Sequence, residues 1–527
     1  MAVSSAHSVN SGALAFSAVV GVIGAGAMGA GIAQVAAAAG HAVLLYDLNE
    51  AACDKALAGI RAQFSRLAEK GRMDPAQADA AGSRIRAVRA LADFAGAALI
   101  VEAAAERLDV KREIFVTLER HVDDSCVLAT NTSSISITSI AAGLRAPHRV
   151  AGLHFFNPAP LMALVEVVSG LATAPDVAQA LYDTAAAWGK RPVMAKSTPG
   201  FIVNRVARPY YAEALRVLNE QGGTPASLDA VMRDAGGFRM GPFELMDLIG
   251  HDVNFAVTES VFRAYFNDSR YTPSLIQQEL VNAGFLGRKS GRGFYDYNEG
   301  AAAPQPRSEA PQPLPEYIGY SFEPGDHTAI ATTIIERLKA RGVAVTKRNS
   351  AEGHRSSEAP AFHTNGAAIY LTDGRTATQR ARDDKHDDMV VYDLVFDFNA
   401  SPRIAIACSG QCSPRAMASA IGMFQAAGFT VTRLDDVPGL AVMRTVAMLA
   451  NEAADAVNQG VCSAQAADVA MQKGVNYPRG PLAWADMVGV RHIVTVLENL
   501  AGSYGEDRYR VSPLLRRREQ SGARIHA

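Results

Sequence analysis

The sequence has no excess of charge of either sign. Its 51 Lys and Arg residues are matched by 53 Asp and Glu residues, so the formal net charge is −2. Because no net field attracts polyanions, neither nucleic acid nor a membrane is expected as a partner. With 49% hydrophobic and 20% charged residues, a disordered or fibrous chain is also excluded. A length of 527 residues is too great for a single core and predicts three or four domains.

Cysteine is scarce, with five residues in the whole chain. The count is odd, and only Cys408 and Cys412 lie near each other in the sequence, without a cluster of histidines beside them. This pattern argues against a disulfide framework and against a zinc site. We therefore expect free thiols, no bound metal and a cytoplasmic protein.

Charged residues are absent from residues 1–46. A secretory signal would need basic residues before its hydrophobic stretch, and a membrane span would have to include the many glycines between Gly24 and Gly40. Residues 1–17 are instead expected to form a flexible tail. The segment after them predicts a buried strand, a glycine turn and a buried helix.

The remaining pattern predicts four structured regions. Strand-like runs at 18–23, 41–47, 97–101, 127–130 and 150–155 alternate with helical segments, which is typical of a doubly wound α/β domain over residues 18–198. Residues 199–298 are predicted to be an all-α domain, and the proline-rich residues 299–316 a linker. Residues 317–436, with a strand expected at 389–398 and a solvated charged stretch at 375–388, predict a degenerate Rossmann-like region, followed by a second helical domain over 437–527.

The helical domain is predicted to occur twice. A shift of 239 residues places Arg205 on Arg444, Glu213 on Glu452 and Gly241-Pro242 on Gly480-Pro481. An internal repeat of this length indicates a duplicated domain. Asn204 falls on Met443 in this register, so the second copy has lost a polar group and the chemistry is expected in the first half.

A nucleotide site is predicted directly after the first strand. Gly24, Gly26 and Gly29 follow the G-x-G-x-x-G pattern, in which glycines allow a tight turn and a close approach of backbone to a pyrophosphate. Ala27 and Met28 lie between them at the start of the helix, whose N-terminal N–H groups favour phosphates. Asp47 ends the second strand, where a carboxylate can bind both ribose hydroxyls and would repel a 2′-phosphate, which favours NAD over NADP.

A catalytic pair is predicted from two polar residues in apolar surroundings. His154 lies in GLHFFNPAP and Glu166 in LMALVEVVSG, where a buried carboxylate is costly unless it is paired. If the two strands fold back around Pro160, His154 and Glu166 stand opposite each other. An imidazole held in one tautomer by a carboxylate can remove a hydroxyl proton near neutral pH. Ser133 and Asn204 could hydrogen-bond the reacting oxygen, although a turn residue and a helix polar residue are equally good interpretations.

Several long motifs, in order, resemble those of the L-3-hydroxyacyl-CoA dehydrogenase family: GAGAMG, VEAAAERLDVK, NTSSISIT, GLHFFNPAP, TPGFIVNR and GRKSGRGFYDY. The resemblance covers residues 18–297, and residues 437–520 resemble a second copy of the family's C-terminal domain. It implies an NAD-dependent enzyme with His154 as general base, Glu166 as its partner, and Ser133 and Asn204 as substrate-positioning groups. It further implies NAD contacts from Asp47, Glu106, Lys111, Asn157 and Lys289, and a contact from Lys70 to CoA.

The whole chain resembles the longer bacterial dehydrogenases of this family, some of which act on 3-hydroxyadipyl-CoA in phenylacetate breakdown. The implied reaction is oxidation of (S)-3-hydroxyacyl-CoA in fatty-acid β-oxidation or a related route. The second helical copy is expected to replace a dimer partner within one chain, unless the protein is a homo-oligomer. Two alternatives are a β-hydroxyacid dehydrogenase acting on free acids, which would use a lysine base, and a non-catalytic NAD-binding descendant.

Overall fold

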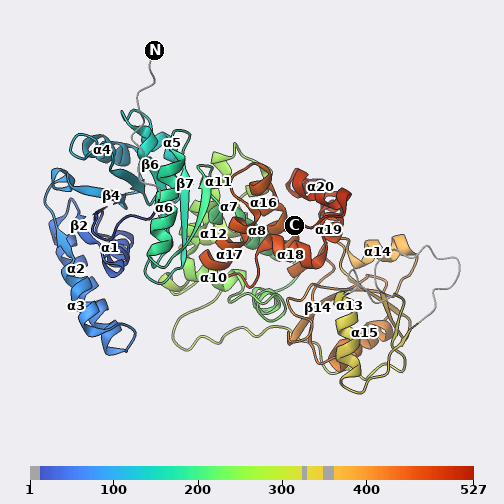
Figure 1. Ribbon diagram of the computed structural model, residues 1–527. Helices are drawn as coiled ribbons and strands as arrows, with labels where there is room; N and C mark the ends of the chain where they lie inside the picture. The colour runs from blue at the N-terminus through green and yellow to red at the C-terminus, as the bar shows by residue number, and fades with distance from the viewer. Residues whose placement is uncertain (1–11, 323–328, 348–360, 527) are drawn as a thin grey trace, which may run out of the picture. The chain divides into compact units, whose positions relative to one another are not determined.

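A computed structural model describes residues 12–322, 329–347 and 361–526 (Figure 1). The chain divides into two compact units, Met1–Arg205 with Gln459–Val475 and Val206–Asn458 with Asn476–Ala527. Of the predicted tail, residues 1–11 lie outside the described residues. In its remainder, the backbone N–H of Leu14 donates to Thr184 Oγ1 at 2.9 Å.

The first unit contains an eight-stranded sheet in the order β3-β2-β1-β4-β5-β6-β7-β8. Neighbouring strands are parallel except β6 and β7, which form an antiparallel pair. The strands are β1 (Val19–Ile23), β2 (Ala42–Tyr46), β3 (Ile85–Ala87), β4 (Ala97–Glu102), β5 (Val127–Thr130), β6 (Val150–Phe155), β7 (Leu164–Ser169) and β8 (Arg191–Lys196). The helices between them are α1 (Ala27–Ala39), α2 (Glu50–Glu69), α3 (Pro75–Ser83), α4 (Leu108–Leu118), α5 (Ile137–Ala141) and α6 (Pro175–Ala187).

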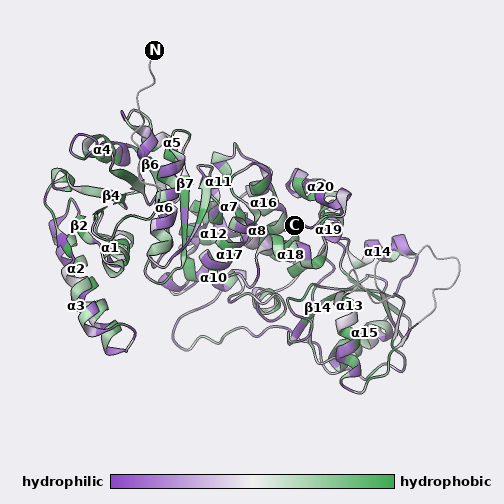
Figure 2. Cartoon of the chain, viewed as in Figure 1, coloured by the Kyte–Doolittle hydropathy of each residue, from purple (hydrophilic) through white to green (hydrophobic). Residues whose placement is uncertain are grey.

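Helices cover both faces of this sheet, which is why its strands are hydrophobic without alternation. Val20 and Val22 of β1 share one buried cluster with residues of α1 and α6. Gly21, between them, faces the other way, because a Cβ there would lie 2.6 Å from the ring of Phe94. Figure 2 shows these strands mainly in the hydrophobic colour. The sheet is therefore a doubly wound core, as predicted.

A segment of the second helical copy also belongs to the first unit. Helix α17 (Ala464–Gly474), capped by Ser463, packs against β7 and β8. A Cβ at Gly474 would lie 2.5 Å from Leu164 Cδ2, and the N–H of Lys196 donates to Val461 O at 2.9 Å. Residues distant in sequence thus complete the packing around the antiparallel edge of the sheet.

The second unit combines a mixed seven-stranded sheet, in the order β10-β9-β11-β12-β13-β14-β15, with helices. Its strands are β9 (Gly319–Tyr320), β10 (Thr346–Lys347), β11 (Ala361–Thr364), β12 (Ala367–Leu371), β13 (Met389–Tyr392), β14 (Arg403–Cys408) and β15 (Thr430–Arg433). Its helices are α8 (Arg208–Asn219), α9 (Pro225–Ala230), α10 (Pro242–Ile249), α11 (His251–Ala264), α12 (Leu275–Asn282), α13 (Ala329–Lys339), α14 (Ala377–Asp384), α15 (Pro414–Ala426), α16 (Val442–Asn458), α18 (Pro481–Val488), α19 (Val490–Tyr504) and α20 (Pro513–Ser521). The short α7 (Val203–Val206) lies at the boundary between the units.

Two local expectations for this region are wrong. The strand expected at 389–398 ends at Tyr392, because the next residue, Asp393, turns its buried carboxylate to the N–H groups of Ala441, Val442 and Met443 at the start of α16. The charged stretch 375–388 is not entirely solvated. Arg380 is fully buried and pairs with Asp373.

The internal repeat is evident in the element boundaries. Helix α10 begins at Pro242 and α18 at Pro481, and α11 and α19 begin at His251 and Val490, each pair 239 residues apart. Helices α8 and α16 contact each other within the second unit. The predicted fold class, with two all-α copies separated by an α/β region, is confirmed. No helix in the described part of the chain is both long and apolar enough to cross a membrane.

Candidate active site

The predicted site residues of the first unit gather at one edge of its sheet. Gly24 follows β1, and Glu106 lies shortly beyond the end of β4. Ser133 comes just after β5, while His154 is near the end of β6. Because β1, β4, β5 and β6 are parallel, their carboxyl ends meet at this edge. The strand order also reverses between β1 and β4, and such a switch point is where doubly wound sheets bind ligands.

The glycine turn has the geometry of a nucleotide cradle. A Cβ at Gly29 would lie 1.8 Å from Gly24 O, so the third glycine is required for the turn itself. Gly24 has φ 100°, in the left-handed region that favours glycine. Around Gly26, by contrast, no atom lies within 4 Å of where a Cβ would be. Gly26 is the N-cap of α1 and offers no side chain to its first N–H groups, and the first turn has no acidic residue. The residues therefore fit a dinucleotide pyrophosphate.

Asp47 is positioned beside this turn by its own hydrogen bonds. Its Oδ2 accepts the N–H of Ala25 at 2.7 Å, and its Oδ1 accepts the N–H of Asn49 at 2.9 Å. Each carboxylate oxygen can accept more than one hydrogen bond. Asp47 can thus hold the glycine turn and still receive ribose hydroxyls.

A buried ion pair, between Lys111 and Glu102, lies at the carboxyl end of β4. Lys111 is 1% exposed, and its Nζ donates to Glu102 Oε1 at 2.7 Å and lies 3.3 Å from Glu106 Oε2. Thr130 Oγ1 also donates to Glu102 at 2.7 Å. Lys111 therefore holds two carboxylates in place, and a direct contact with NAD stays a prediction.

Glu106 organises the turn that carries Ser133. Its Oε1 accepts from Thr132 Oγ1 at 2.7 Å, from the N–H of Ser133 at 2.9 Å and from the N–H of Ser134 at 3.2 Å. Burial acts to raise the pKa of Glu106, but the hydrogen bond from Thr132 and the charge of Lys111 outweigh it and the pKa is lowered. The ionised carboxylate thus fixes the backbone on which Ser133 stands.

His154 and Glu166 form a buried hydrogen-bonded pair. They are register partners in the β6–β7 hairpin, and His154 Nδ1 donates to Glu166 Oε2 at 2.7 Å. The second oxygen, Oε1, accepts the N–H groups of Ile202 and Val203, each at 3.0 Å. The predicted pairing across the turn is confirmed.

This pairing defines the protonation of the imidazole. Glu166 is fully buried and its oxygens only accept, so the neutral ring carries its proton on Nδ1. Nε2 makes no hydrogen bond to a described residue and is left as the basic nitrogen. The rings of Phe156 and Phe201, at centroid distances of 4.6 and 5.8 Å, hold the imidazole in orientation.

Asn204 and Ser133 are brought together by the fold. Asn204 Nδ2 donates to Ser133 O at 3.5 Å, although the two residues are 71 positions apart. Both lie in the first unit, as do His154 and Glu166. The structure therefore unites the four residues predicted to carry the chemistry in one unit.

The other predicted contacts lie as follows. Ala27 and Met28 are in the first turn of α1, and Asn157 is exposed in the turn after β6. Lys70 is the exposed C-cap of α2, and Lys289 belongs to the second unit, where its Nζ donates to Asp252 Oδ1 at 2.5 Å. Their contacts with NAD or CoA stay predictions.

The family models for 3-hydroxyacyl-CoA dehydrogenases match most of the chain. The NAD-binding domain model matches residues 19–198, and the C-terminal domain model matches both 200–297 and 439–523. A third model, the reduced Rossmann-fold domain of 3-hydroxybutyryl-CoA dehydrogenase, matches residues 369–438. The chain belongs to the 3-hydroxyacyl-CoA dehydrogenase family. It is an oxidoreductase with the family's NAD-binding domain.

Relatives of this dehydrogenase resemble it over different lengths. The 3-hydroxyadipyl-CoA dehydrogenase of Escherichia coli K12 is 45% identical over 95% of this chain and 97% of its own length. A probable 3-hydroxybutyryl-CoA dehydrogenase of Bacillus subtilis is 42% identical over 53% of this chain and 96% of its own. The crystal structure of 3-hydroxybutyryl-CoA dehydrogenase from Escherichia coli K12 matches with a TM-score of 0.86 and 43% identity, over 96% of this chain and 99% of that one.

Sequence reasoning missed three polar groups of the dehydrogenase's site. Glu102 ends the apolar run AALIVE, and a carboxylate there could have been suspected of a buried pair. Thr132 and Asn131 lie beside Ser133, and Asn131 Oδ1 accepts the N–H of Phe155 at 2.8 Å, linking β5 to β6. None of the five cysteines forms a disulfide in the structure. The described residues contain no group of three or more His, Cys, Asp or Glu able to hold a metal.

Proposed function

We propose that the protein oxidises (S)-3-hydroxyacyl-CoA to 3-oxoacyl-CoA with His154 as the general base. The observation that carries the proposal is the buried bond from His154 Nδ1 to Glu166, which leaves Nε2 to accept the proton of the 3-hydroxyl group. When that proton is transferred, the imidazolium is stabilised by the neighbouring carboxylate. NAD, when bound, supplies the acceptor for the hydride that leaves C3.

The remaining groups are assigned by their positions. Ser133 and Asn204 orient the hydroxyl oxygen, and Glu106 holds the turn on which Ser133 stands. The glycine turn of residues 24–29 and Asp47 hold the dinucleotide. A lysine base, as in the β-hydroxyacid dehydrogenases, finds no support here, because Lys111 is buried and paired.

The test is a panel of substrates followed by NADH absorbance. The panel contains 3-hydroxybutyryl-CoA, a longer unbranched 3-hydroxyacyl-CoA, 3-hydroxyadipyl-CoA and the corresponding free acids. Turnover of the thioesters without turnover of the free acids is expected. Turnover of the free acids without turnover of the thioesters would make the protein a hydroxyacid dehydrogenase. No turnover of any substrate would favour a non-catalytic descendant.

His154→Gln tests the assignment of the base. Loss of a general base costs about 10²–10⁴-fold in kcat, while NADH binding should be unchanged because the glycine turn is intact. His121→Gln is the matched control, since His121 is an exposed histidine of the same unit. Near-normal turnover of the His154 variant would refute the proposed role.

A further inference from the structure

The second unit contains a cavity of about 390 Å³ between α8 and the segment of residues 504–508. Three arginines line it, namely Arg208, Arg216 and Arg508, together with two glutamates, Glu220 and Glu506. Its volume is in the range of small-molecule sites. None of these residues belongs to the predicted nucleotide or reaction site.

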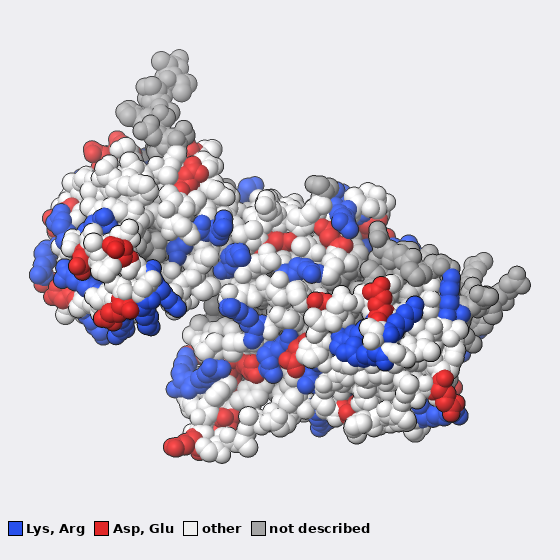
Figure 3. Space-filling model, turned by 60° about the horizontal axis from the view of Figure 1, so that its bottom comes forward, with Lys and Arg blue, Asp and Glu red and all other residues white. Residues whose placement is uncertain are grey.

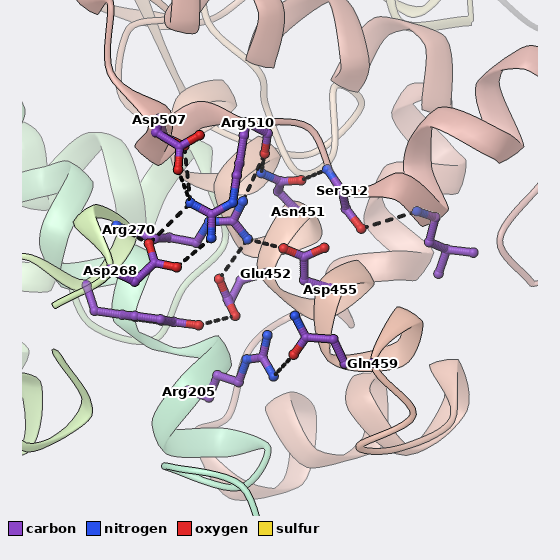
Figure 4. A network of polar contacts seen from close by, with 12 residues as sticks. Arg205, Asp268, Arg270, Asn451, Glu452, Asp455, Gln459, Asp507, Arg510 and Ser512 are labelled. Atoms are coloured by element: carbon purple, nitrogen blue, oxygen red, sulfur yellow. Dashed lines mark hydrogen bonds and ion pairs between the residues drawn. The ribbon is translucent and has the colours of Figure 1, made fainter. Parts of the chain in front are cut away.

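The internal repeat provides a counterpart of this region in which the polar side chains pair with one another. In the register of 239 residues, α8 corresponds to α16. The DSRY segment ending at Tyr271 corresponds to the EDRY segment ending at Tyr509, with a shift that is one residue shorter, 238 residues. Figure 4 shows the counterpart as a network of polar contacts. There, Arg270 Nη1 pairs with Asp455 and with Glu452 Oε2 at 3.3 Å, and its Nη2 donates to Arg510 O at 2.9 Å.

Two of the differences between the copies change the polar groups at the cavity. Asn451 belongs to the counterpart network, where its Nδ2 donates to Arg510 O and its Oδ1 accepts the N–H of Ser512, at 2.9 and 2.7 Å. The corresponding residue of α8 is Ala212, which lines the cavity and has no polar group. Asp455, which neutralises Arg270, corresponds to Arg216.

Arg508 is less completely paired than Arg270, its counterpart in the other copy. Arg508 is 6% exposed and donates no hydrogen bond to a described residue, and its Nε lies 3.6 Å from Glu506 Oε2. Both oxygens of Glu506 already accept from Arg216, at 3.1 and 2.9 Å. The buried Nε of Arg508 is without a hydrogen-bond partner among the described residues, which is unfavourable, and an anion bound to the guanidinium would compensate for it.

The other charged groups leave one positive charge in excess. Glu220 accepts from Arg444 and from Tyr504, at 3.2 and 2.7 Å. Arg208, also buried, donates to Thr258 Oγ1 at 3.0 Å and lies over the ring of Tyr211. Counted together with the neighbouring pair of Arg444 and Glu213, whose carboxylate also acts on Arg508, four arginines face three glutamates. One positive charge is left, which suits a single negative charge better than a dianion.

We propose that this cavity binds a small organic monocarboxylate. Its carboxylate would pair with Arg508, since a guanidinium presents two parallel N–H groups to such an ion. Its apolar body would lie against Leu215, Pro273 and Leu275, which line the cavity. The glutamates on the wall would repel a phosphate dianion.

The experiment titrates the full-length protein with octanoate by isothermal titration calorimetry, with inorganic phosphate and the neutral octanamide in parallel. Saturable binding of octanoate, without saturable binding of phosphate or octanamide, is expected. Arg508→Gln should weaken octanoate binding about 10-fold or more, as for loss of a charge-assisted hydrogen bond. The double variant Ala212→Asn/Arg216→Asp introduces the two polar groups of the other copy, of which the aspartate can neutralise Arg508, and should abolish binding.

Arg263→Gln is the matched control, because Arg263 is an exposed arginine of the same unit that does not line the cavity. Each variant is first shown to melt cooperatively. Octanoate binding that is unchanged in both cavity variants would overturn the proposal, as would saturable binding of phosphate in its place. Binding lost in His154→Gln but kept in Arg508→Gln would assign the carboxylate to the reaction site and overturn it as well.

Discussion

Replacement of Glu166 by Gln should separate the shape of the catalytic pair from its charge. Glu166 uses both oxygens, Oε2 for His154 Nδ1 and Oε1 for the N–H groups of Ile202 and Val203. A glutamine keeps only one accepting oxygen. If that oxygen serves the two backbone donors, the amide NH₂ faces Nδ1, which must then become the acceptor. The ring proton moves to Nε2, and the base is lost.

The expected size of the effect follows from this tautomer change. An analogous carboxylate-to-amide replacement in a Ser-His-Asp triad costs about 10⁴-fold in kcat. We expect a loss of about 10²–10⁴-fold, or about 3 to 5 kcal/mol in activation free energy. If the oxygen stays on His154 instead, the NH₂ faces two buried N–H groups, and the loss appears as a lower melting temperature.

The assay measures kcat by NADH absorbance and NADH affinity by fluorescence, with melting temperature as the check on folding. Glu119→Gln is the matched control, because Glu119 is also buried and accepts two backbone N–H groups, from Arg145 and Ala146 at 2.8 Å, but has no histidine partner. A Glu166→Gln variant with normal turnover and normal stability would refute the reasoning.

Three further predictions concern the cradle, the Ser133 turn and the repeat. Gly29→Ala should unfold or distort the turn, because the new Cβ would lie 1.8 Å from Gly24 O. Gly26→Ala should fold normally, since no atom lies within 4 Å of its Cβ position, but should bind NADH more weakly. Equal melting temperatures of the two variants would contradict this prediction. The pKa of Glu106 is lowered from 4.5, so its contribution to stability is present above pH 4.5 and is lost as the pH falls through the folded pKa. In urea titrations across this acidic range, the free energy of unfolding of Glu106→Gln should therefore fall less with pH than that of the wild type. Parallel falls of the two free energies would count against this role of Glu106. Removal of residues 301–527 takes α17 away from β7 and β8 and should cause association in gel filtration, so a well-behaved monomer would argue against the intrachain replacement of a dimer partner.

Much of the first unit could be predicted because its signals are local. The run from Ala18 to Ile23 and the glycines after it describe a strand and a turn within a dozen residues, and β1 and α1 form there. The β6–β7 hairpin could also be predicted, since His154 and Glu166 are equally distant from Pro160 and face each other in the observed register.

Features that depend on distant packing could not be predicted. Local periodicity gives no reason why α17 should pack on β7 and β8. The end of β13 depends on Asp393, whose carboxylate binds N–H groups about 50 residues further along. Lys111 reads as a surface residue of a helix, yet Glu102 makes its burial possible. For α17 and for Asp393, the partner lies far away in the sequence.

The return of residues 459–475 to the first unit has a consequence for biosynthesis. The strands β7 and β8 are made early, but the helix that packs against them emerges only when most of the chain has left the ribosome. Until then, Gly474 does not yet pack on the apolar side chain of Leu164, and the nascent chain exposes a hydrophobic surface that is prone to aggregation. Mutations that stop translation before α17 should therefore lower the solubility of the N-terminal half.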